Sequence, residues 1–236
     1  MQTPEISVVM LCYHEGEVAL QSARKAISLF EKAGLDFELI IVANYKDVND
    51  PTPALVAEFA KTDPRVRYST VFKQGMFGWD MRTGFALATG NYVAVIDGDG
   101  QMPFEDIVRV YEAARASNAD MGKTYRTKRH DGKWRIFISR IYNVLFHLLF
   151  PGLKARDMNS KPKVFPRRSF EKLHLVSDDW FIDAEMMIQT RRHHFTIVEV
   201  PTVFYKLEGR RSLVRLRTIV EFLRNFVIFR THEFFV

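Results

Sequence analysis

The chain has 236 residues, of which 47% are hydrophobic and 26% charged, a composition that allows a sizeable core and excludes a disordered protein. The formal net charge is +6, and basic residues cluster at 123–135 and 206–217. Such clusters attract nucleotide diphosphates, phospholipids or nucleic acid, or form a solvated basic face. With one cysteine, Cys12, no signal peptide and no apolar run suited to a bilayer, we expect a cytoplasmic protein without an intrachain disulfide.

Short apolar runs alternate with helical patterns over the first hundred residues. Strands are predicted at 6–13, 37–44, 66–72 and 91–97. Helices are predicted from about Leu20 to a stop at Gly34, from Pro51 to about Lys61, from about Trp79 to Thr89 with a stop at Gly90, and onward from Pro103. This alternation predicts βαβ units and a mostly parallel sheet, in which ligands bind beyond the carboxyl ends of the strands. Tyr13, Asn44 and Asp97 all lie at such ends.

The second half of the chain is less regular. Strands are predicted at 119–125, 161–167 and 196–205, and Pro201 favours an edge or a bulge for the last of them. A helix over 180–192 is predicted, with Ser177 or Asp178 as its N-cap. Two more helices carry apolar stripes: Trp134, Ile138, Ile141, Leu145 and Leu148 over 134–150, and Leu216, Ile219, Val220, Leu223, Phe226 and Val227 over 212–230. We therefore expect an α/β domain over 1–211, followed by an amphipathic helical segment over 212–236.

An acidic loop, Asp97-Gly98-Asp99-Gly100-Gln101, follows the fourth predicted strand. Two carboxylates one residue apart in a tight turn can both reach a hard cation such as Mg²⁺ or Mn²⁺, and substrate phosphates then complete its shell. The glycines let the backbone approach a ligand closely, and the amide oxygen of Gln101 can add a contact. Because short acidic turns are common, the position at a strand end is what favours a metal site here.

Several segments resemble one known family. ISVVMLCYHEGE, FELIIVANYKD and GWDMRTGFALATGNYVAVIDGDGQMPFEDI resemble the family 2 inverting glycosyltransferases of GT-A fold. Within them the chain looks most like the polyprenyl-phosphate sugar synthases, the group that contains dolichyl-phosphate mannose synthase. ARDMNSKPKVFPR, WFIDAEMMIQTRRHHFTIVEVPTVF and GRRS continue the match, which covers about residues 5–217. The resemblance implies a single GT-A-type, Rossmann-like domain with a mostly parallel central sheet.

The resemblance also implies roles for individual residues. Those that match positions binding the nucleotide sugar are Tyr13, Glu15, Asn44, Arg82, Asp97, Gly98, Asp99 and Ser212. Those that match the metal loop are Asp97, Asp99 and Gln101. The predicted catalytic residues are Asp99, Arg135, Asp183, Glu185 and Arg210, and Asp157 matches a further active-site position. In this pattern Arg135 meets an acceptor phosphate, and Lys123 or Arg126 shares that task.

Two departures from the family pattern bear on the substrates. Ala43-Asn44 replaces the usual Asp-Asp, so a charge-assisted bond to the base or ribose is lost. Lys161-Pro162 replaces Gly-Phe, which removes an aromatic wall and adds a cation. The first departure puts the choice of donor in question, and the second puts the usual lipid-phosphate acceptor in question.

The predicted activity is transfer of a hexose from a UDP- or GDP-sugar to a polyprenyl phosphate, such as dolichyl or undecaprenyl phosphate, with inversion and with Mg²⁺ or Mn²⁺. A phosphate acceptor is already an anion and needs no general base, whereas a sugar hydroxyl would need Asp179, Asp183 or Glu185. Transfer to a soluble or saccharide acceptor, and a non-catalytic nucleotide-sugar binder, are the alternatives. The lack of an early glycine-rich loop with a lysine disfavours a sugar-1-phosphate nucleotidyltransferase, and nucleic-acid binding would leave the acidic loop unexplained.

The last predicted helix bears on where the protein works. Its arginines, Arg217, Arg224 and Arg230, flank an apolar face, and a basic amphipathic helix can lie in a membrane interface. We therefore expect peripheral contact with an anionic membrane on its cytoplasmic side, weakened by deletion of residues 213–236. Packing of the helix onto the domain is the alternative, and a membrane-protein partner or a homo-oligomer also stays open.

Overall fold

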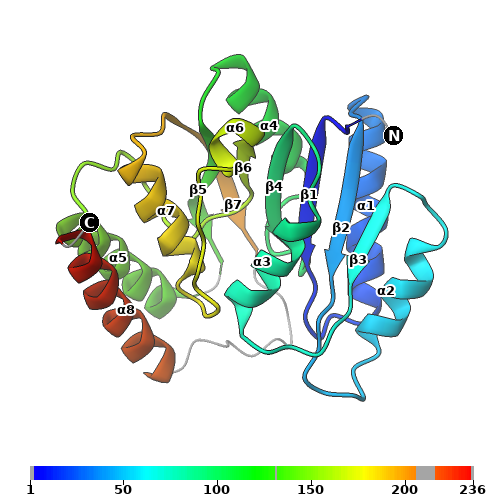
Figure 1. Ribbon diagram of the computed structural model, residues 1–236, viewed down its shortest axis with the longest axis horizontal. Coiled ribbons are helices and arrows are strands. Elements are labelled where there is room, and N and C mark those ends of the chain that lie inside the picture. Colours follow the sequence, from blue (N-terminus) through cyan, green and yellow to red (C-terminus); the bar gives the residue numbers. More distant parts are fainter. Residues whose placement is uncertain (1–2, 131, 206–215, 235–236) are drawn as a thin grey trace.

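The computed structural model describes residues 3–130, 132–205 and 216–234. Within them a seven-stranded sheet has the order β3-β2-β1-β4-β6-β5-β7 (Figure 1). Its strands are β1 (Ile6–Leu11), β2 (Phe37–Val42), β3 (Val66–Ser69), β4 (Tyr92–Asp97), β5 (Met121–Arg129), β6 (Lys163–Pro166) and β7 (Ile197–Phe204). The helices are α1 (Glu17–Lys32), α2 (Thr52–Ala60), α3 (Phe77–Leu87), α4 (Glu105–Ala116), α5 (Lys133–Leu149), α6 (Arg167–Phe170), α7 (Ile182–Arg192) and α8 (Leu216–Phe234).

The sheet is mostly parallel, as the alternation of strands and helices predicts. β1 pairs in parallel with β2 and β4, and β2 pairs in parallel with β3. β6 is the exception, because it runs antiparallel to both β4 and β5. Since β4 and β5 both oppose β6, they point the same way, and their carboxyl ends lie on the same edge as those of β1 and β2. This edge, at the lower side of Figure 1, is where the fold places a ligand.

Two buried apolar clusters hold helices on opposite faces of the sheet. One cluster joins α1, α2 and α4 to the sheet through side chains such as Phe30, Val56 and Ile107. The other joins α3, α5, α7 and α8, with Phe146, Phe181 and others at its centre. The strands β1, β2 and β4 are buried on both faces, which explains why their sequences are continuous apolar runs.

The predicted apolar stripe of α8 is confirmed at Phe226 but wrong at Leu223 and Val227. Phe226 is 1% exposed and packs into the domain, flanked by Phe222 and Phe229, whereas Leu223 and Val227 are 48% and 62% exposed. Among the described side chains, the packing face therefore includes Phe226 of the predicted stripe together with Phe222 and Phe229 beside it. The proposed boundary between residues 211 and 212 lies outside the described residues, as do the side chains at 216–220.

The stripe predicted for α5 is also only partly buried. Tyr142, Leu145, Phe146 and Leu149 face the second cluster. The outer face exposes a second apolar row: Trp134 (70%), Phe137 (53%), Ile141 (45%), Val144 (57%) and Leu148 (72%). α5 and α8 lie side by side at the left of Figure 1, and the rings of Tyr142 and Phe222 are 5.2 Å apart. The helix is thus apolar on two sides, one of which faces solvent.

Smaller predictions are confirmed or corrected by local geometry. β7 is an edge strand, and its partner β5 has a register shift between Arg126 and Lys128, which agrees with the edge or bulge expected from Pro201. The N-cap of α7 is Phe181, not Ser177 or Asp178. α3 stops at Leu87 because Ala88 is already extended, before Gly90, and the short helix α6 was not predicted.

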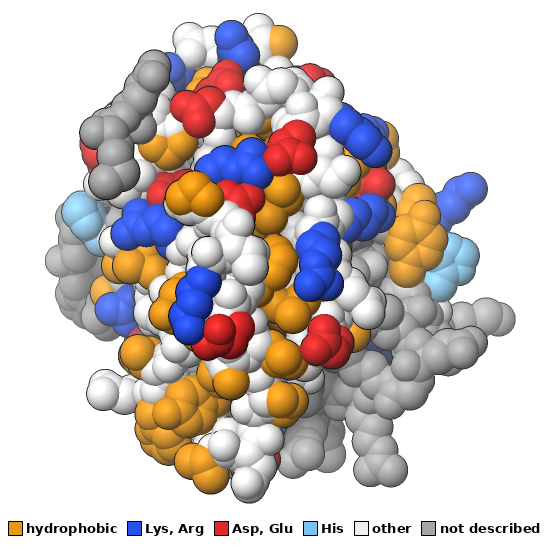
Figure 2. All heavy atoms as spheres, turned by 90° about the vertical axis from the view of Figure 1, so that its right-hand side faces the viewer, with side chains coloured by type: hydrophobic (Ala, Val, Ile, Leu, Met, Phe, Trp, Pro, Cys, Tyr) orange, Lys and Arg blue, Asp and Glu red, His pale blue; other side chains and the backbone are white. Residues whose placement is uncertain are grey.

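One face of the molecule carries both acidic and basic side chains. On the side that carries α2 and β3, acidic and basic side chains alternate with apolar ones, and no patch of a single sign stands out (Figure 2). Among the helices of the described residues, none combines the length and apolar character needed to cross a membrane.

Candidate active site

The acidic loop is anchored to the end of β1. Asp97 lies opposite Leu11 in the parallel register, and the Gly98 amide donates to the Leu11 carbonyl oxygen over 2.8 Å. A side chain at Gly98 would place its Cβ 2.3 Å from the Cys12 sulfur. Gly98 is therefore required because the loop backbone packs against Cys12. The sequence suggested a different reason, namely the close approach of a ligand. Gly100 has a φ of +73°, the left-handed conformation that glycine adopts readily.

Three carboxylates gather around the Cys12 thiol. Burial raises the pKa of Cys12, and the charges of Glu15, Asp99 and Asp97 raise it further. Asp99 is 9% exposed, and its Oδ1 accepts a hydrogen bond from the Gln101 amide over 2.9 Å. The loop therefore concentrates negative charge at the carboxyl edge of the sheet.

The chemistry of this loop suits a hard divalent cation. Gln101 donates from Nε2 to the Tyr205 carbonyl oxygen over 3.2 Å, so its Oε1 is the end that could ligate a cation. Together with the Asp97 and Asp99 carboxylates it forms a set of oxygen donors, the kind that Mg²⁺ uses beside phosphate oxygens. Among the described residues, no group of three or more His, Cys, Asp or Glu side chains has metal-site geometry.

A row of alternating charges connects Asp97 to the interior. The register of β4 and β6 pairs Val95 with Lys163, and continuing it by two residues brings Lys161 opposite Asp97. The Lys161 Nζ lies 3.2 and 3.3 Å from the two Asp97 oxygens and 3.1 Å from Asp183 Oδ2. Lys163 donates to the other Asp183 oxygen. We call this chain of ion pairs, Asp97–Lys161–Asp183–Lys163, the charge row.

Burial and the neighbouring charges together set the protonation of the charge row. Burial alone would raise the pKa of Asp183, but the ammonium groups of Lys161 and Lys163 outweigh it and hold that pKa below its usual value. Burial lowers the pKa of Lys163 to about 8, against the opposing effect of Asp183. Asp183 is thus an ionised carboxylate whose two oxygens are both occupied by lysines.

The predicted nucleotide wall contains two residues that the sequence did not single out. The Lys73 ammonium lies 4.1 Å from the centre of the Tyr13 ring and forms an ion pair with Asp80. Asn44 donates to Asp80 over 3.1 Å and accepts from Ser69 Oγ over 2.8 Å. Asn44 is 1% exposed, so it braces β2, β3 and α3. Asp80 thus puts a carboxylate beside Asn44, and its place in the first turn of α3 was the available signal.

Two predicted site residues are used to hold the 173–181 loop. Glu185 accepts hydrogen bonds from the amides of Val176 and Ser177 over 2.9 and 2.8 Å. Arg82 pairs with Asp178 over 2.5 Å. The structure therefore does not bring either side chain to the acidic loop. Arg210 and Ser212 lie outside the described residues.

A basic pocket of about 250 Å³ opens between the end of β5 and α5. Its lining includes Arg126, Arg129, Ser139, Arg140 and Arg156. Arg126 and Asp157 form a two-pronged ion pair with distances of 2.7 and 2.8 Å. Burial alone would raise the pKa of Asp157, but the charges of Arg126 and then Lys123 keep it well below its usual value. The predicted Arg135 is not part of this lining, whereas Arg140, further along the same helix, is.

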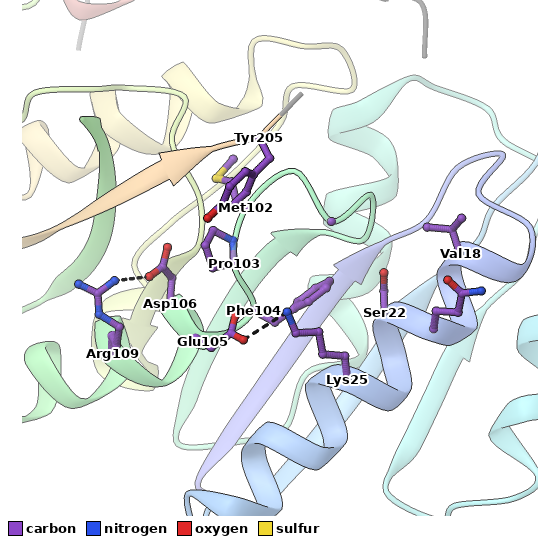
Figure 3. Close-up of a pocket in the computed structure, with 12 residues that line it drawn as sticks. Val18, Ser22, Lys25, Met102, Pro103, Phe104, Glu105, Asp106, Arg109 and Tyr205 are labelled. Carbon is purple, nitrogen blue, oxygen red and sulfur yellow. Dashed lines mark hydrogen bonds and ion pairs between the residues drawn. The ribbon is translucent and has the colours of Figure 1, made fainter. Parts of the chain in front are cut away.

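A larger hollow of about 680 Å³ lies on the other side of the acidic loop (Figure 3). Lys25 of α1 and Glu105 of α4 face each other across it at 3.2 Å, and Met102 and Tyr205 border it from the loop side. Arg109 pairs with Asp106, so the charged groups of this hollow largely satisfy one another. The basic pocket is therefore the better match for an anion.

Residues 7–173 match a family model described as glycosyl transferase family 2. The glycosyltransferase AglD of Haloferax volcanii is 27% identical over 224 residues, which cover 92% of this chain and 35% of AglD. The dolichyl-phosphate beta-glucosyltransferase of Saccharomyces cerevisiae is 26% identical, and the match covers 95% of this chain and 74% of the yeast protein. The undecaprenyl-phosphate 4-deoxy-4-formamido-L-arabinose transferase of Sodalis glossinidius is 29% identical, and the match covers 96% of this chain and 68% of the Sodalis protein. The chain thus spans about a third of AglD.

Solved structures with the same fold include two synthases. The mannosyl-3-phosphoglycerate synthase of Rubrobacter xylanophilus has a TM-score of 0.69 at 16% identity, covering 93% of this chain and 70% of that one. The glucosyl-3-phosphoglycerate synthase of Mycobacterium tuberculosis, in complex with Mn²⁺, uridine diphosphate and phosphoglyceric acid, has a TM-score of 0.66 at 17% identity, covering 95% and 76%. At these identities the likeness concerns the fold, and it confirms the predicted GT-A architecture.

Proposed function

Because the chain belongs to glycosyl transferase family 2, we propose that it transfers a hexose from a nucleotide-diphosphate sugar to a polyprenyl phosphate, with inversion at the anomeric carbon. The observation that carries the proposal is the basic pocket at the end of β5. β5 and β4 point the same way, so this pocket opens on the same edge of the sheet as the acidic loop. The names of the yeast and Sodalis relatives, which include dolichyl and undecaprenyl phosphate, support the choice of acceptor.

The proposed reaction is a single in-line displacement. A phosphate oxygen of the acceptor attacks the anomeric carbon, a new carbon–oxygen bond forms, and the bond to the nucleoside diphosphate breaks. Arg140 and Arg156 balance the charge of the acceptor phosphate, which is already an anion near neutral pH. Asp97, Asp99 and Gln101 would hold Mg²⁺ or Mn²⁺, which stabilises the charge that builds up on the leaving diphosphate. The UDP and Mn²⁺ complex of the mycobacterial synthase supports this assignment of the donor side.

The charge row favours a phosphate acceptor over a hydroxyl acceptor. A hydroxyl needs a carboxylate that can take its proton. Both oxygens of Asp183 accept from lysines, and Glu185 accepts from two backbone amides. Asp179 accepts from Asn225 over 2.6 Å and from the Phe181 amide over 2.8 Å. The candidate bases named by the sequence are thus engaged elsewhere.

Replacing Arg140 with Gln is expected to raise the KM for polyprenyl phosphate by about ten- to a hundredfold, because one charge-assisted hydrogen bond, typically worth about 1.5–3 kcal/mol, is lost. Donor affinity should not change. The assay measures sugar transfer from UDP- and GDP-hexoses to dolichyl and undecaprenyl phosphate. Arg168→Gln is the matched control, since Arg168 is a half-exposed arginine on α6, away from the pocket. Turnover with a saccharide but with no lipid phosphate would replace this proposal with the saccharide-acceptor alternative.

We further propose that the protein contacts anionic membranes through the outer face of α5. Five large apolar side chains are exposed there, and Trp134 and Phe137 stack at 5.7 Å. The same helix lines the basic pocket through Arg140, so a lipid whose phosphate enters the pocket would leave its chain near this face. Exposed cations on the helix pair, such as Arg140 and Arg224, complement anionic headgroups. This assigns to α5 the main contact that the sequence assigned to the last helix.

Replacing Val144 with Glu is expected to lower binding to phosphatidylglycerol-containing vesicles about tenfold, since the buried apolar area of one valine is worth about 1.5–3 kcal/mol. Vesicle co-sedimentation measures the effect. Val176→Glu is the control, because Val176 is similarly exposed (65%, against 57% for Val144) but lies in the 173–181 loop. Point variants are preferable to deletion of 213–236, which would uncover the core around Phe226. Unchanged vesicle binding by Val144→Glu would remove this membrane surface.

A further inference from the structure

A lysine ammonium group occupies the fork of the first carboxylate of the acidic loop. The Lys161 Nζ is 3.2 Å from Asp97 Oδ1 and 3.3 Å from Oδ2, so it contacts both oxygens. It also lies 3.1 Å from Asp183 Oδ2 and 4.3 Å from the centre of the Phe77 ring. The Lys161 side chain is 4% exposed, whereas that of Asp97 is 27% exposed. Asp97 therefore faces the ligand side, while Lys161 supports it from behind.

Lysine charges balance two of the carboxylates in this region. Asp97 pairs with Lys161, and Asp183 pairs with both Lys161 and Lys163. A divalent cation at the loop would lie close to the positive charge of Lys161 and would be repelled by it. A diphosphate at the loop would add negative charge and oxygen ligands, and would reverse this balance.

We propose that Lys161 is the resident counter-ion of Asp97, and that it makes divalent-metal binding at the acidic loop depend on a bound nucleoside diphosphate. The inference rests on the proposed function for the identity of that ligand. Lys161 acts here as a positioning residue, since its buried ammonium group touches Asp97 and not the surface that faces the donor. Without a diphosphate it neutralises Asp97 and disfavours a second cation. With a diphosphate the phosphate oxygens supply the missing negative charge, and the metal is retained.

The test is a Mn²⁺ titration followed by the electron paramagnetic resonance signal of free Mn²⁺, with and without UDP or GDP. The wild-type protein is expected to bind Mn²⁺ at least tenfold more tightly when the diphosphate is present. Lys161→Met is expected to bind Mn²⁺ alone at least tenfold more tightly than the wild type, a gain of about 1.4 kcal/mol. Lys163→Met is the matched control, because Lys163 is a buried lysine of the same segment that pairs with Asp183 and not with Asp97. It should bind Mn²⁺ alone within about threefold of the wild type.

Several outcomes would overturn the proposal. One is a folded Lys161→Met protein, checked by circular dichroism, that binds Mn²⁺ alone as weakly as the wild type. If that variant does not fold, the Mn²⁺ titration of the wild-type protein is still a test, since equal Mn²⁺ affinity with and without diphosphate contradicts the inference. The titration needs neither acceptor nor turnover, so failure of the lipid-acceptor assay leaves it intact. Lack of Mn²⁺ binding to any of these proteins with UDP and with GDP would overturn both this inference and the metal part of the proposed function.

Discussion

Replacing Asp99 with Asn is expected to lower kcat/KM for sugar transfer by roughly a hundred- to a thousandfold, because the metal that would stabilise the charge on the leaving diphosphate loses a carboxylate ligand. Asp99 is the more deeply buried carboxylate of the acidic loop. Asn keeps an oxygen that can accept from the Gln101 amide, so the turn itself should survive. The loss would then come from the missing negative charge toward the metal and not from unfolding. Steady-state kinetics with a saturating acceptor measures the effect.

A chelator provides the companion measurement. EDTA should abolish transfer by the wild-type protein, and added Mn²⁺ or Mg²⁺ should restore it. Asp178→Asn serves as the control, because Asp178 is half-exposed and pairs with Arg82, away from the loop. If transfer survives both EDTA and Asp99→Asn, the metal mechanism is wrong, although the acceptor assignment could still hold.

Replacing Asp183 with Asn is expected to lower the free energy of unfolding by about 3–5 kcal/mol, the typical cost of removing one partner from a buried ion pair. Asp183 is 6% exposed and accepts from Lys161 and Lys163, which are 3% and 0% exposed. The amide would leave Lys163 as a buried charge without its carboxylate partner. Urea unfolding followed by circular dichroism measures the change.

A double variant separates charge from shape in this prediction. Asp183→Asn combined with Lys163→Met removes the buried ammonium group of Lys163 together with its carboxylate partner. The double variant should therefore recover part of the stability that Asp183→Asn alone loses. If Asp183→Asn alone costs less than about 1 kcal/mol, the figure typical of an exposed pair, the charge row does not support the core as described. In that case Asp183 would again be a candidate proton acceptor for a hydroxyl substrate.

Local patterns predicted most of the fold, including the buried face of α1, but not which faces of α5 and α8 are buried. The β-strands β1, β2 and β4 are short apolar runs between helical patterns, and those signals are contained in neighbouring residues. A helical period identifies a buried face only when the opposite face is polar. α5 has apolar side chains on two faces, and α8 has phenylalanines beside its predicted stripe, so their periods were ambiguous. Contacts with distant segments of the folded chain determined which faces of α5 and α8 are buried.

The candidate site divides in the same way. The strand pattern was enough to predict that Tyr13, Asn44 and Asp97 lie on one edge, because the carboxyl ends of parallel strands must meet there. Only the tertiary structure placed Lys161 against Asp97, through the antiparallel pairing of β6 with β4 across more than sixty residues of chain. The same holds for Glu185, which supports a loop. Position along a strand is a local property, whereas the partner of a buried charge depends on distant segments, because that charge must be balanced by whichever group the completed fold brings beside it.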